Sequence, residues 1–344
     1  MNWNRNQNIY NNVLESIGLT PMIRLNKISK PDGAEICVKL EYTNPSGSLK
    51  DRVVYSILEK AEQKGALKPG MILLEGTTGN TGIAAAMVGA AKGYPVIIVM
   101  PEGMSEERKK TILAYGAELV LTPGAETDVD LVLEEVEKLK AKYGEKIFEI
   151  GQFYRQENLQ AHMENTAPEI WEQTAGQFDA FIMCQGTGGT VTGNAKFLKE
   201  KNPDIKIFIS EPSESPILAY GKIGQHKIQG IADGLIPPIL DLDYVDGMIL
   251  VSSAESIKMA RVIAKKEGIF CGISSGCNVA AALKLAEKYP HLKRIVTIIN
   301  DNGLRYLTTE LCGSPVTRIP LERDYLLSSE NKEKLAGYKF EIIE

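Results

Sequence analysis

The chain has 344 residues, 44% of them hydrophobic, and a formal net charge of −5. This composition is typical of a soluble globular protein with one large domain or two. No apolar run is long enough to cross a membrane, and the polar residues 1–10 lack the apolar core of a signal peptide, so we expect a cytoplasmic location and no membrane partner. The mild negative charge, without a basic stripe interleaved with aromatic residues, argues against nucleic acid as a partner.

Short β-rich runs alternate with helical patterns along the chain, which predicts an α/β protein. The first series has expected strands at 36–42, 71–75, 95–100, 118–121 and 146–149, and expected helices at 51–63, 81–92, 106–115 and 128–143. The second series has strands at 180–184, 205–210, 247–251 and 294–299, and helices at 160–173, 189–201, 253–266 and 276–288. Repeated strand-helix-strand units favour mainly parallel sheets, with ligands gathering beyond the carboxyl ends of the strands.

A turn-forming run at 44–48, with the sequence NPSGS, delivers Lys50 to the start of a predicted helix. Ser48 can cap the backbone there. The positive end of the helix dipole disfavours an ammonium group and favours a neutral amine, which can form a Schiff base. The alternative is an ordinary solvated lysine in a capped first turn.

A second turn, 77–82, has the sequence TTGNTG and lies between an expected strand and the next expected helix. It offers hydroxyls, an amide and free N–H groups at a positive helix end, which suits a substrate carboxylate. A capped strand-helix turn without a ligand is the alternative.

A third turn, Gly186–Thr190, follows an apolar strand and precedes a helix. Its glycines allow a backbone nest whose N–H groups converge on a phosphate, and its threonines add hydroxyls. Neither the Walker nor the Rossmann spacing is present, so a small phosphorylated cofactor fits better than a nucleotide. A fourth segment, 272–276, has the sequence GISSG, in which either serine can cap a helix that we expect to begin near Cys277.

Taken together in this order, the four segments resemble those of the cysteine synthase and cystathionine β-synthase family, the fold type II enzymes that use pyridoxal 5'-phosphate. The resemblance runs from Ser16 to Leu307, nearly the whole chain. It implies a tryptophan synthase β-like fold of two three-layer α/β/α domains with mainly parallel sheets and the cofactor in the cleft between them. The implied boundaries are 46–156 for a smaller, mobile domain, 10–45 plus 157–319 for a larger one, and 320–344 for a C-terminal tail.

The resemblance also implies residue roles. Lys50 would hold the cofactor and then move the α-proton, Asn80 would lie beside the phenolic oxygen, and Ser274 would hydrogen-bond the pyridine nitrogen. The phosphate cradle would be Gly186, Thr187, Gly188, Gly189 and Thr190, and the substrate carboxylate site with its support would be Thr77, Thr78, Gly79, Asn80, Thr81 and Gln152.

The Ser274 role has a chemical consequence. A neutral hydroxyl does not keep the ring nitrogen protonated as a carboxylate would, so the ring is a weaker electron sink and loss of a group from Cβ is favoured. We therefore expect elimination or replacement at Cβ of a cysteine- or serine-type amino acid through an aminoacrylate. Closure of the smaller domain around the substrate would exclude water.

One difference from the family's usual sequence affects whether water can react in the closed site. Residues 229–237 read QGIADGLIP, where typical cysteine synthases have GIGAGFIP, so Asp233 replaces a small residue. A carboxylate there can serve as a general base for water or a partner for an incoming thiol. We therefore predict release of hydrogen sulfide from L-cysteine, with formation of L-serine or lanthionine. The alternative is a solvent-facing turn residue, since Asp-Gly is a common turn dipeptide.

Further features leave alternatives open. Residues 299–303 read INDNG in place of the usual LPSSG, which changes the hydrogen bonding near the ring nitrogen or simply forms a strand-end Asx turn. The five cysteines fit reduced thiols, and the three histidines form no metal-binding grouping, so we expect no metal.

The rival functions are O-acetylserine sulfhydrylase activity and a non-catalytic amino-acid-sensing relative. The expected partners are a second copy in a homodimer and, as a family possibility, a serine acetyltransferase.

Overall fold

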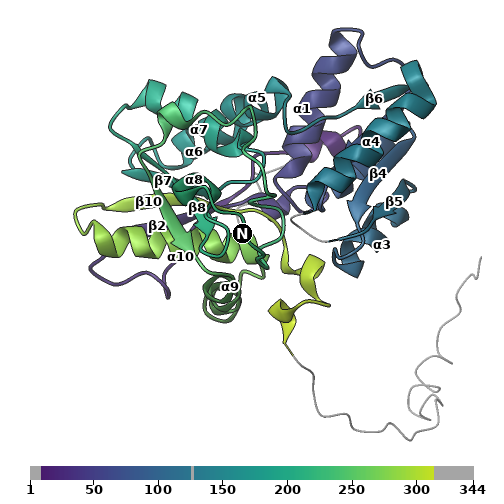
Figure 1. Ribbon diagram of the computed structural model, residues 1–344. Helices are drawn as coiled ribbons and strands as arrows, with labels where there is room; N and C mark the ends of the chain where they lie inside the picture. Colours follow the sequence, from purple (N-terminus) through teal and green to yellow (C-terminus); the bar gives the residue numbers. More distant parts are fainter. Residues whose placement is uncertain (1–8, 125–127, 314–344) are drawn as a thin grey trace, which may run out of the picture. The chain divides into compact units, whose positions relative to one another are not determined.

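The computed structural model describes residues 9–124 and 128–313. Their strands form two sheets (Figure 1). The larger sheet has the order β1 (Met22–Arg24), β2 (Glu35–Leu40), β10 (Arg294–Ile299), β7 (Ala180–Cys184), β8 (Lys206–Pro212) and β9 (Gly247–Val251). The smaller sheet has the order β5 (Glu118–Thr122), β4 (Val96–Pro101), β3 (Ile72–Gly76) and β6 (Ile147–Glu149). All neighbouring strands are parallel except the β1–β2 pair, which confirms the predicted mainly parallel α/β class.

Both faces of the smaller sheet are buried because its strands are apolar at successive positions. Leu73 packs in one core with α1 (Lys50–Gln63) and α2 (Asn80–Lys92), whereas Leu74 packs in a second core with α4 (Val129–Tyr143). Side chains alternate between the two faces of a strand, so a continuous apolar run requires helices on both sides. The remaining helix of this half is α3 (Glu106–Ala114).

The larger sheet is also covered on both sides. In Figure 1, α5 (Gln156–Ala161), α6 (Ala167–Gln173) and α7 (Gly189–Lys201) lie on one side, and α9 (Ser253–Glu267) and α10 (Ile273–Lys288) lie on the other. The short helix α8 (Ile217–Tyr220) follows β8. Strand β2 belongs to this sheet through its pairing with β10, although it precedes the whole smaller sheet in the sequence.

The structure differs from the prediction at three places. The short edge strand β1 was not predicted. The helix expected at 160–173 is instead α5, one π-helical turn (His162–Thr166) and α6. The helix expected to begin near Cys277 begins at Ile273, so Ser274 and Ser275 lie inside its first turn and the expectation that either serine caps it is wrong.

Three further observations concern the cysteines, the length of the helices and the C-terminal tail. All five cysteines are free thiols. Within residues 9–124 and 128–313, no helix is both long and apolar enough to span a membrane. The tail expected at 320–344 lies outside the described residues.

Candidate active site

Two adjoining cavities bring the predicted site residues together from both sheets. Lys50, Asn80 and Thr187 line both cavities. The first is also lined by Ser274 and Asn300 and by three more positions of the predicted phosphate loop (Gly186–Thr190), namely Gly186, Gly188 and Thr190. Gly189, the fifth position of this loop, lines neither cavity and packs against Asn158. The second is also lined by Thr77, Thr78, Gly79, Thr81, Gln152 and Asp233.

Lys50 is the first residue of α1, as its sequence predicted. Its backbone N–H donates to Ser48 Oγ over 3.3 Å, but the N-cap residue of α1 is Leu49, which makes no side-chain capping bond, so Ser48 is not the cap. Lys50 Nζ donates to Gln152 Oε1 over 3.2 Å. Burial lowers the pKa of Lys50, while the nearby Asp233 and Glu75 carboxyls oppose this change. The site therefore favours a neutral, nucleophilic amine.

The turn 77–81 precedes and opens α2, with its polar groups facing the second cavity. Thr81 Oγ1 donates to Gln152 Oε1 over 2.6 Å, so one amide oxygen accepts from both Thr81 and Lys50. Thr77 Oγ1 accepts the backbone N–H of Gly79 over 3.1 Å. A carboxylate in this cavity would therefore meet fixed hydroxyls at the positive end of α2.

The phosphate loop leads into the N-terminus of α7 and follows β7. Its glycines are required by close packing: a Cβ on Gly186 would lie 2.7 Å from the Gly230 carbonyl oxygen, and one on Gly188 would lie 2.7 Å from Leu240 Cβ. Gly188 also has a φ of +81°, which glycine adopts without strain. The loop thus forms a cradle at a helix end whose first N–H groups have no partner within the helix.

Two buried side chains that the sequence did not single out support this loop from behind. Asn158 Nδ2 donates to Thr187 Oγ1 over 2.9 Å, and His162 Nε2 lies 3.1 Å from Thr190 Oγ1 in hydrogen-bond contact. Burial lowers the pKa of His162 to about 3, so the imidazole is neutral. The position of His162 on a π-helical turn could not be read from the sequence.

Ser274 and Asn80 approach the first cavity from opposite elements, α10 and α2. Ser274 Oγ accepts from Asn300 Nδ2 over 3.0 Å. Asn80 Nδ2 donates to Asp301 Oδ2 over 2.8 Å, and the buried Asn80 Oδ1 has no hydrogen-bond partner among the described residues. Residues 300 and 301, the second departure noted in the sequence, thus contact both side chains predicted to contact the cofactor ring.

Asp233 lies on a loop whose backbone is held in an uncommon conformation. Ala232 has a φ of +51°, which is strained for a residue with a Cβ, and its N–H donates to the Gln185 carbonyl over 3.0 Å. The Asp233 side chain is buried, with 7% of the residue exposed, and lines the second cavity with Lys50 and Gln152. The alternative of a solvent-facing turn residue is therefore wrong.

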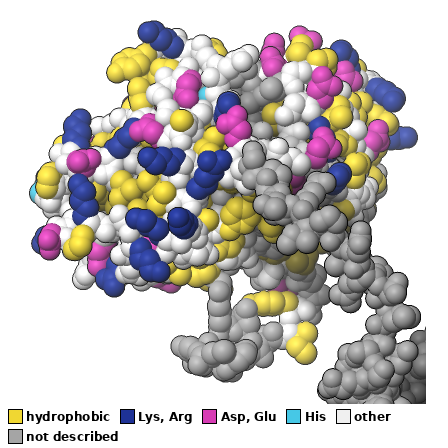
Figure 2. All heavy atoms as spheres, turned by 90° about the horizontal axis from the view of Figure 1, so that it is seen from below, with side chains coloured by type: hydrophobic (Ala, Val, Ile, Leu, Met, Phe, Trp, Pro, Cys, Tyr) yellow, Lys and Arg dark blue, Asp and Glu magenta, His cyan; other side chains and the backbone are white. Residues whose placement is uncertain are grey.

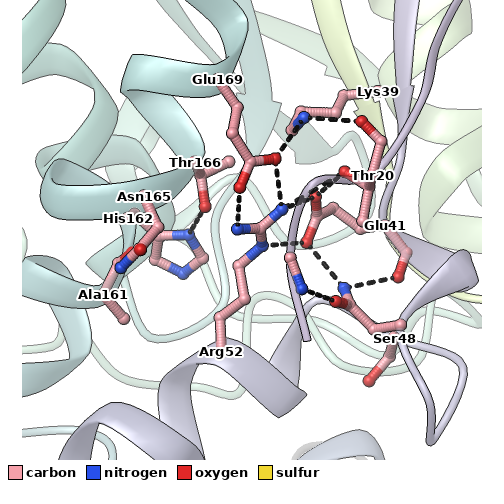
Figure 3. A network of polar contacts seen from close by, with 12 residues as sticks. Thr20, Lys39, Glu41, Ser48, Arg52, Ala161, His162, Asn165, Thr166 and Glu169 are labelled. Atoms are coloured by element: carbon pink, nitrogen blue, oxygen red, sulfur yellow. Dashed lines mark hydrogen bonds and ion pairs between the residues drawn. The ribbon is translucent and has the colours of Figure 1, made fainter. Parts of the chain in front are cut away.

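A buried ion-pair network behind Lys50 was not predicted (Figure 3). Arg52 donates to Glu41 through Nε (2.7 Å) and Nη2 (2.9 Å), and to Glu169 through Nη1 (2.7 Å) and Nη2 (2.8 Å). Lys39 adds a further ion pair of 2.7 Å to Glu169. Arg52 belongs to the same helix turn as Lys50, so the network fixes that turn against the larger sheet and α6. Arg52 and Glu169 are far apart in the sequence, so no local sequence pattern indicates this network.

Glu75 is a second carboxyl near Lys50 that the sequence did not reveal. It ends β3, is 2% exposed, and accepts the Gly151 N–H over 2.7 Å. Burial raises the pKa of Glu75 to about 8, although hydrogen bonds from Gly151 and Gln152 oppose the rise. Glu75 thus supports the backbone that carries Gln152.

One further hollow contains none of the predicted site residues. It lies between α9, α10 and residues 28–34, with apolar positions such as Met259, Val262 and Leu283 in its walls. Figure 2 shows hydrophobic side chains surrounded by Lys and Arg on the face seen from below.

Comparison with known proteins gives the class of this site. The family model for pyridoxal-phosphate dependent enzymes matches residues 13–301. A cysteine synthase of Staphylococcus aureus is 44% identical over 301 residues, which cover 87% of this chain and 96% of the relative. A hydrogen sulfide-producing enzyme from Fusobacterium nucleatum is 41% identical with a TM-score of 0.84, covering 87% of this chain and 100% of that one.

Another solved structure is that of a hydrogen sulfide-producing enzyme in which an aspartate is replaced by asparagine, complexed with an α-aminoacrylate intermediate. It is 37% identical with a TM-score of 0.82, covering 89% of this chain and 92% of that one. These matches define a pyridoxal-phosphate dependent enzyme. More particularly, the chain belongs to the cysteine synthase family of fold type II, and it catalyses replacement or elimination at Cβ of an amino acid. The non-catalytic alternative is thereby set aside.

The residues present fit pyridoxal phosphate. The cradle at 186–190 is kept open by glycines at places where a Cβ would collide with neighbours. Lys50, Ser274 and this cradle line one cavity. The buried Asn80 Oδ1 in the same lining has no hydrogen-bond partner among the described residues, so it can still accept a hydrogen bond from a bound group. The amine, hydroxyl and phosphate-binding groups that the cofactor requires are thus on one surface.

Proposed function

We propose that this enzyme releases hydrogen sulfide from L-cysteine by adding water at Cβ, which yields L-serine, and that Asp233 is the general base for the water. In the overall reaction the Cβ–S bond breaks, a Cβ–O bond forms, and cysteine plus water gives serine plus hydrogen sulfide without oxidation or reduction. A second cysteine in place of water would give lanthionine by the same balance.

The observation that carries the proposal is the buried Asp233 carboxyl in the cavity wall shared with Lys50 and Gln152. Asp233 and Lys50 line the same cavity, and the Asp233 carboxyl raises the pKa of Lys50 against the larger, opposite effect of burial. A carboxylate at a place where the family has a small side chain can take a proton from water as the water attacks. Enclosure of the group strengthens this effect, because few solvent molecules compete.

The other site residues have separate tasks in this proposal. When bound, pyridoxal phosphate supplies the electron sink that allows Cα to lose its proton. Lys50 accepts that proton at Nζ, and Gln152 Oε1 holds the amine in place. The hydroxyls and N–H groups of 77–81 orient the substrate carboxylate, and residues 186–190 hold the cofactor phosphate. Movement of the half formed by residues 46–156 toward the other would then exclude bulk water.

The relatives support this direction of cysteine metabolism. Two of them are hydrogen sulfide-producing enzymes, and one of these was studied as an aspartate mutant together with an α-aminoacrylate. The Staphylococcus aureus relative is a cysteine synthase, which favours the second candidate function, synthesis of L-cysteine from O-acetylserine and sulfide.

The test compares two reactions of the holoenzyme and identifies the products by mass. With L-cysteine alone we expect sulfide and serine, or lanthionine, at a higher kcat/KM than cysteine formation from O-acetylserine and sulfide. Asp233→Asn should lower serine formation by about 10²-fold, the usual scale for a general base. The exposed Asp204→Asn is the matched control and should change nothing. Unchanged serine formation in Asp233→Asn would refute the base assignment, and faster cysteine synthesis would select the second candidate.

We also propose a cytoplasmic homodimer with one site in each subunit. Light scattering of the purified chain tests the dimer, which a monomeric mass would exclude. A serine acetyltransferase is the family's candidate partner. Mixing the two proteins and measuring their joint mass would reveal a complex.

A further inference from the structure

A line of buried polar groups runs from β7 through α10 to the end of β10 and reaches the cavity at Ser274. Its members are the Cys184 backbone N–H and the side chains of Asn278, Asn300 and Ser274, and each residue is at most 4% exposed. Each contact in this line has a donor and an acceptor, so the direction of every hydrogen bond follows from the first.

The first bond fixes the orientation of Asn278. The Cys184 backbone N–H can only donate, and it donates to Asn278 Oδ1 over 2.7 Å. The amide nitrogen of Asn278 therefore faces the other way, where Nδ2 donates to the Ile298 carbonyl over 2.8 Å. The same Nδ2 lies 3.3 Å from Asn300 Oδ1 and donates to it. Two backbone groups, the Cys184 N–H and the Ile298 carbonyl, thus determine on which side each of the two asparagine amides carries its oxygen and on which side its nitrogen.

The orientation of Asn300 then determines what Ser274 can do. With Oδ1 turned to Asn278, Asn300 Nδ2 donates to Ser274 Oγ over 3.0 Å. A serine hydroxyl has one hydrogen, and this contact uses an oxygen lone pair and leaves the hydrogen available. Among the described residues no acceptor takes that hydrogen, and Ser274 lines the cavity that contains Lys50 and the phosphate loop.

We infer that Asn300, oriented by Asn278, is a positioning residue that makes Ser274 a hydrogen-bond donor to the ring nitrogen of bound pyridoxal phosphate and so keeps this nitrogen unprotonated. The inference rests on the placement of the cofactor in the proposed site. An unprotonated ring withdraws electrons from Cα weakly, so loss of the Cβ substituent is favoured over side reactions at Cα. The family's usual proline at position 300 has no side-chain donor, so the hydrogen bond from position 300 to Ser274 is a feature of the present sequence.

The test reads the protonation of the ring nitrogen directly. The holoenzyme is prepared with pyridoxal phosphate labelled with ¹⁵N in the ring, and its ¹⁵N chemical shift is compared with that of the free cofactor in acidic and alkaline solution. The wild-type shift should match the unprotonated form. A wild-type shift that matches the protonated form overturns the inference without any variant.

Two variants test the direction of the relay. In Asn300→Asp, a carboxylate accepts from both Asn278 and Ser274, so the serine lone pair turns to the ring and the shift should move toward the protonated form. In Asn300→Ala, Ser274 loses its fixed orientation and the shift should move part of the way. The exposed Asn26→Asp makes the same chemical change on the surface and should leave the shift unchanged. Shifts equal to the wild-type value in both position-300 variants would also overturn the inference.

A second readout is the ratio of reaction types. Racemisation or transamination of the amino acid, relative to sulfide release or cysteine synthesis, should rise about tenfold in Asn300→Asp, which corresponds to about 1.4 kcal/mol of differential stabilisation. The inference and the proposed function fail separately. Cysteine synthesis with an unprotonated wild-type ring would refute only the sulfide-releasing function, whereas sulfide release with a protonated ring would refute only the relay.

Discussion

The Lys50 side of the cavity and the Asp233 loop reach the same space by different structural means. Lys50 begins a regular helix, and its turn is fixed by the ion pairs of Arg52 (Figure 3). Asp233 follows a residue with a left-handed backbone on a loop without regular secondary structure. The common part of the chemistry is thus built on a helix end, whereas the proposed choice of nucleophile depends on an irregular loop.

This difference suggests how the family can change its product. A helix end with a buried ion-pair network tolerates little change, because each charge removed leaves another uncompensated. A loop can exchange one side chain without altering its surroundings in the core. We therefore expect substitutions near Lys50 to abolish reaction or folding, and substitutions near Asp233 to redirect the products.

The largest effect is expected from Lys50→Ala. Without the amine the α-proton has no acceptor, so turnover of L-cysteine and of O-acetylserine should both fall by at least about 10³-fold. Turnover is measured as sulfide release and as cysteine formation. The exposed Lys64→Ala, on the turn that follows the same helix, should retain full activity. Loss of only one of the two reactions would contradict a shared role for Lys50.

Arg52→Ala should be the most destabilising change. It leaves Glu41 and Glu169 buried without their main counter-charge, which costs about 3–5 kcal/mol for a buried pair. Urea unfolding monitored by circular dichroism measures this loss. Arg24→Ala removes an exposed pair with Glu35 and should cost about 1 kcal/mol or less. Equal losses in the two variants would show that the network does not anchor the Lys50 turn.

Glu75 makes the stability near Lys50 depend on pH. Its pKa is raised from 4.5 to about 8 in the folded chain, so the folded state binds more protons than the unfolded state between these values. The stabilising contribution is complete below about pH 4.5 and is lost as the pH rises to about 8, by up to a few kcal/mol. Urea unfolding at several pH values should show that Glu75→Gln removes this decline, whereas the surface Glu59→Gln should keep it. A decline retained in Glu75→Gln would assign it to another group.

The sequence predicted the elements that regular patterns encode. Apolar runs gave the parallel strands, and glycine-rich turns between strand and helix gave the phosphate loop and the 77–81 turn. The helix start at Ile273 was missed because the GISSG segment offers serines that resemble caps although they lie inside the first turn. Strand β1 was missed because three residues are too few to show a period.

The missed site residues depend on contacts between distant segments. Glu41 and Glu169 lie 128 positions apart and meet only through Arg52, and His162 meets Thr190 only because α5, α7 and the π-helical turn pack together. No local spacing can reveal such pairs. Asp233 was recognised because its motif differed from the family pattern, but its burial required the fold.

The smallest expected effect is that of Ala232→Gly, which separates loop strain from loop function. Glycine relieves a left-handed conformation that costs about 1–2 kcal/mol and adds about 0.4–1 kcal/mol of unfolded-state entropy, so stability should change by about 1 kcal/mol or less. Ala175 has the same φ of +51° on the exposed turn after α6, and Ala175→Gly is therefore a matched control. Both variants should have similar unfolding free energies.

Only Ala232→Gly should change the chemistry, because only there does the backbone orient Asp233. A looser loop should lower serine formation about two- to fivefold, equivalent to about 0.5–1 kcal/mol of barrier, while proton exchange at Cα, measured in deuterated water, stays constant. If Ala175→Gly lowered serine formation equally, the loss would follow from general flexibility. If neither variant lowered it, the strained backbone at Ala232 would have no part in directing Asp233, and the carboxyl would have to be held by its side-chain surroundings alone.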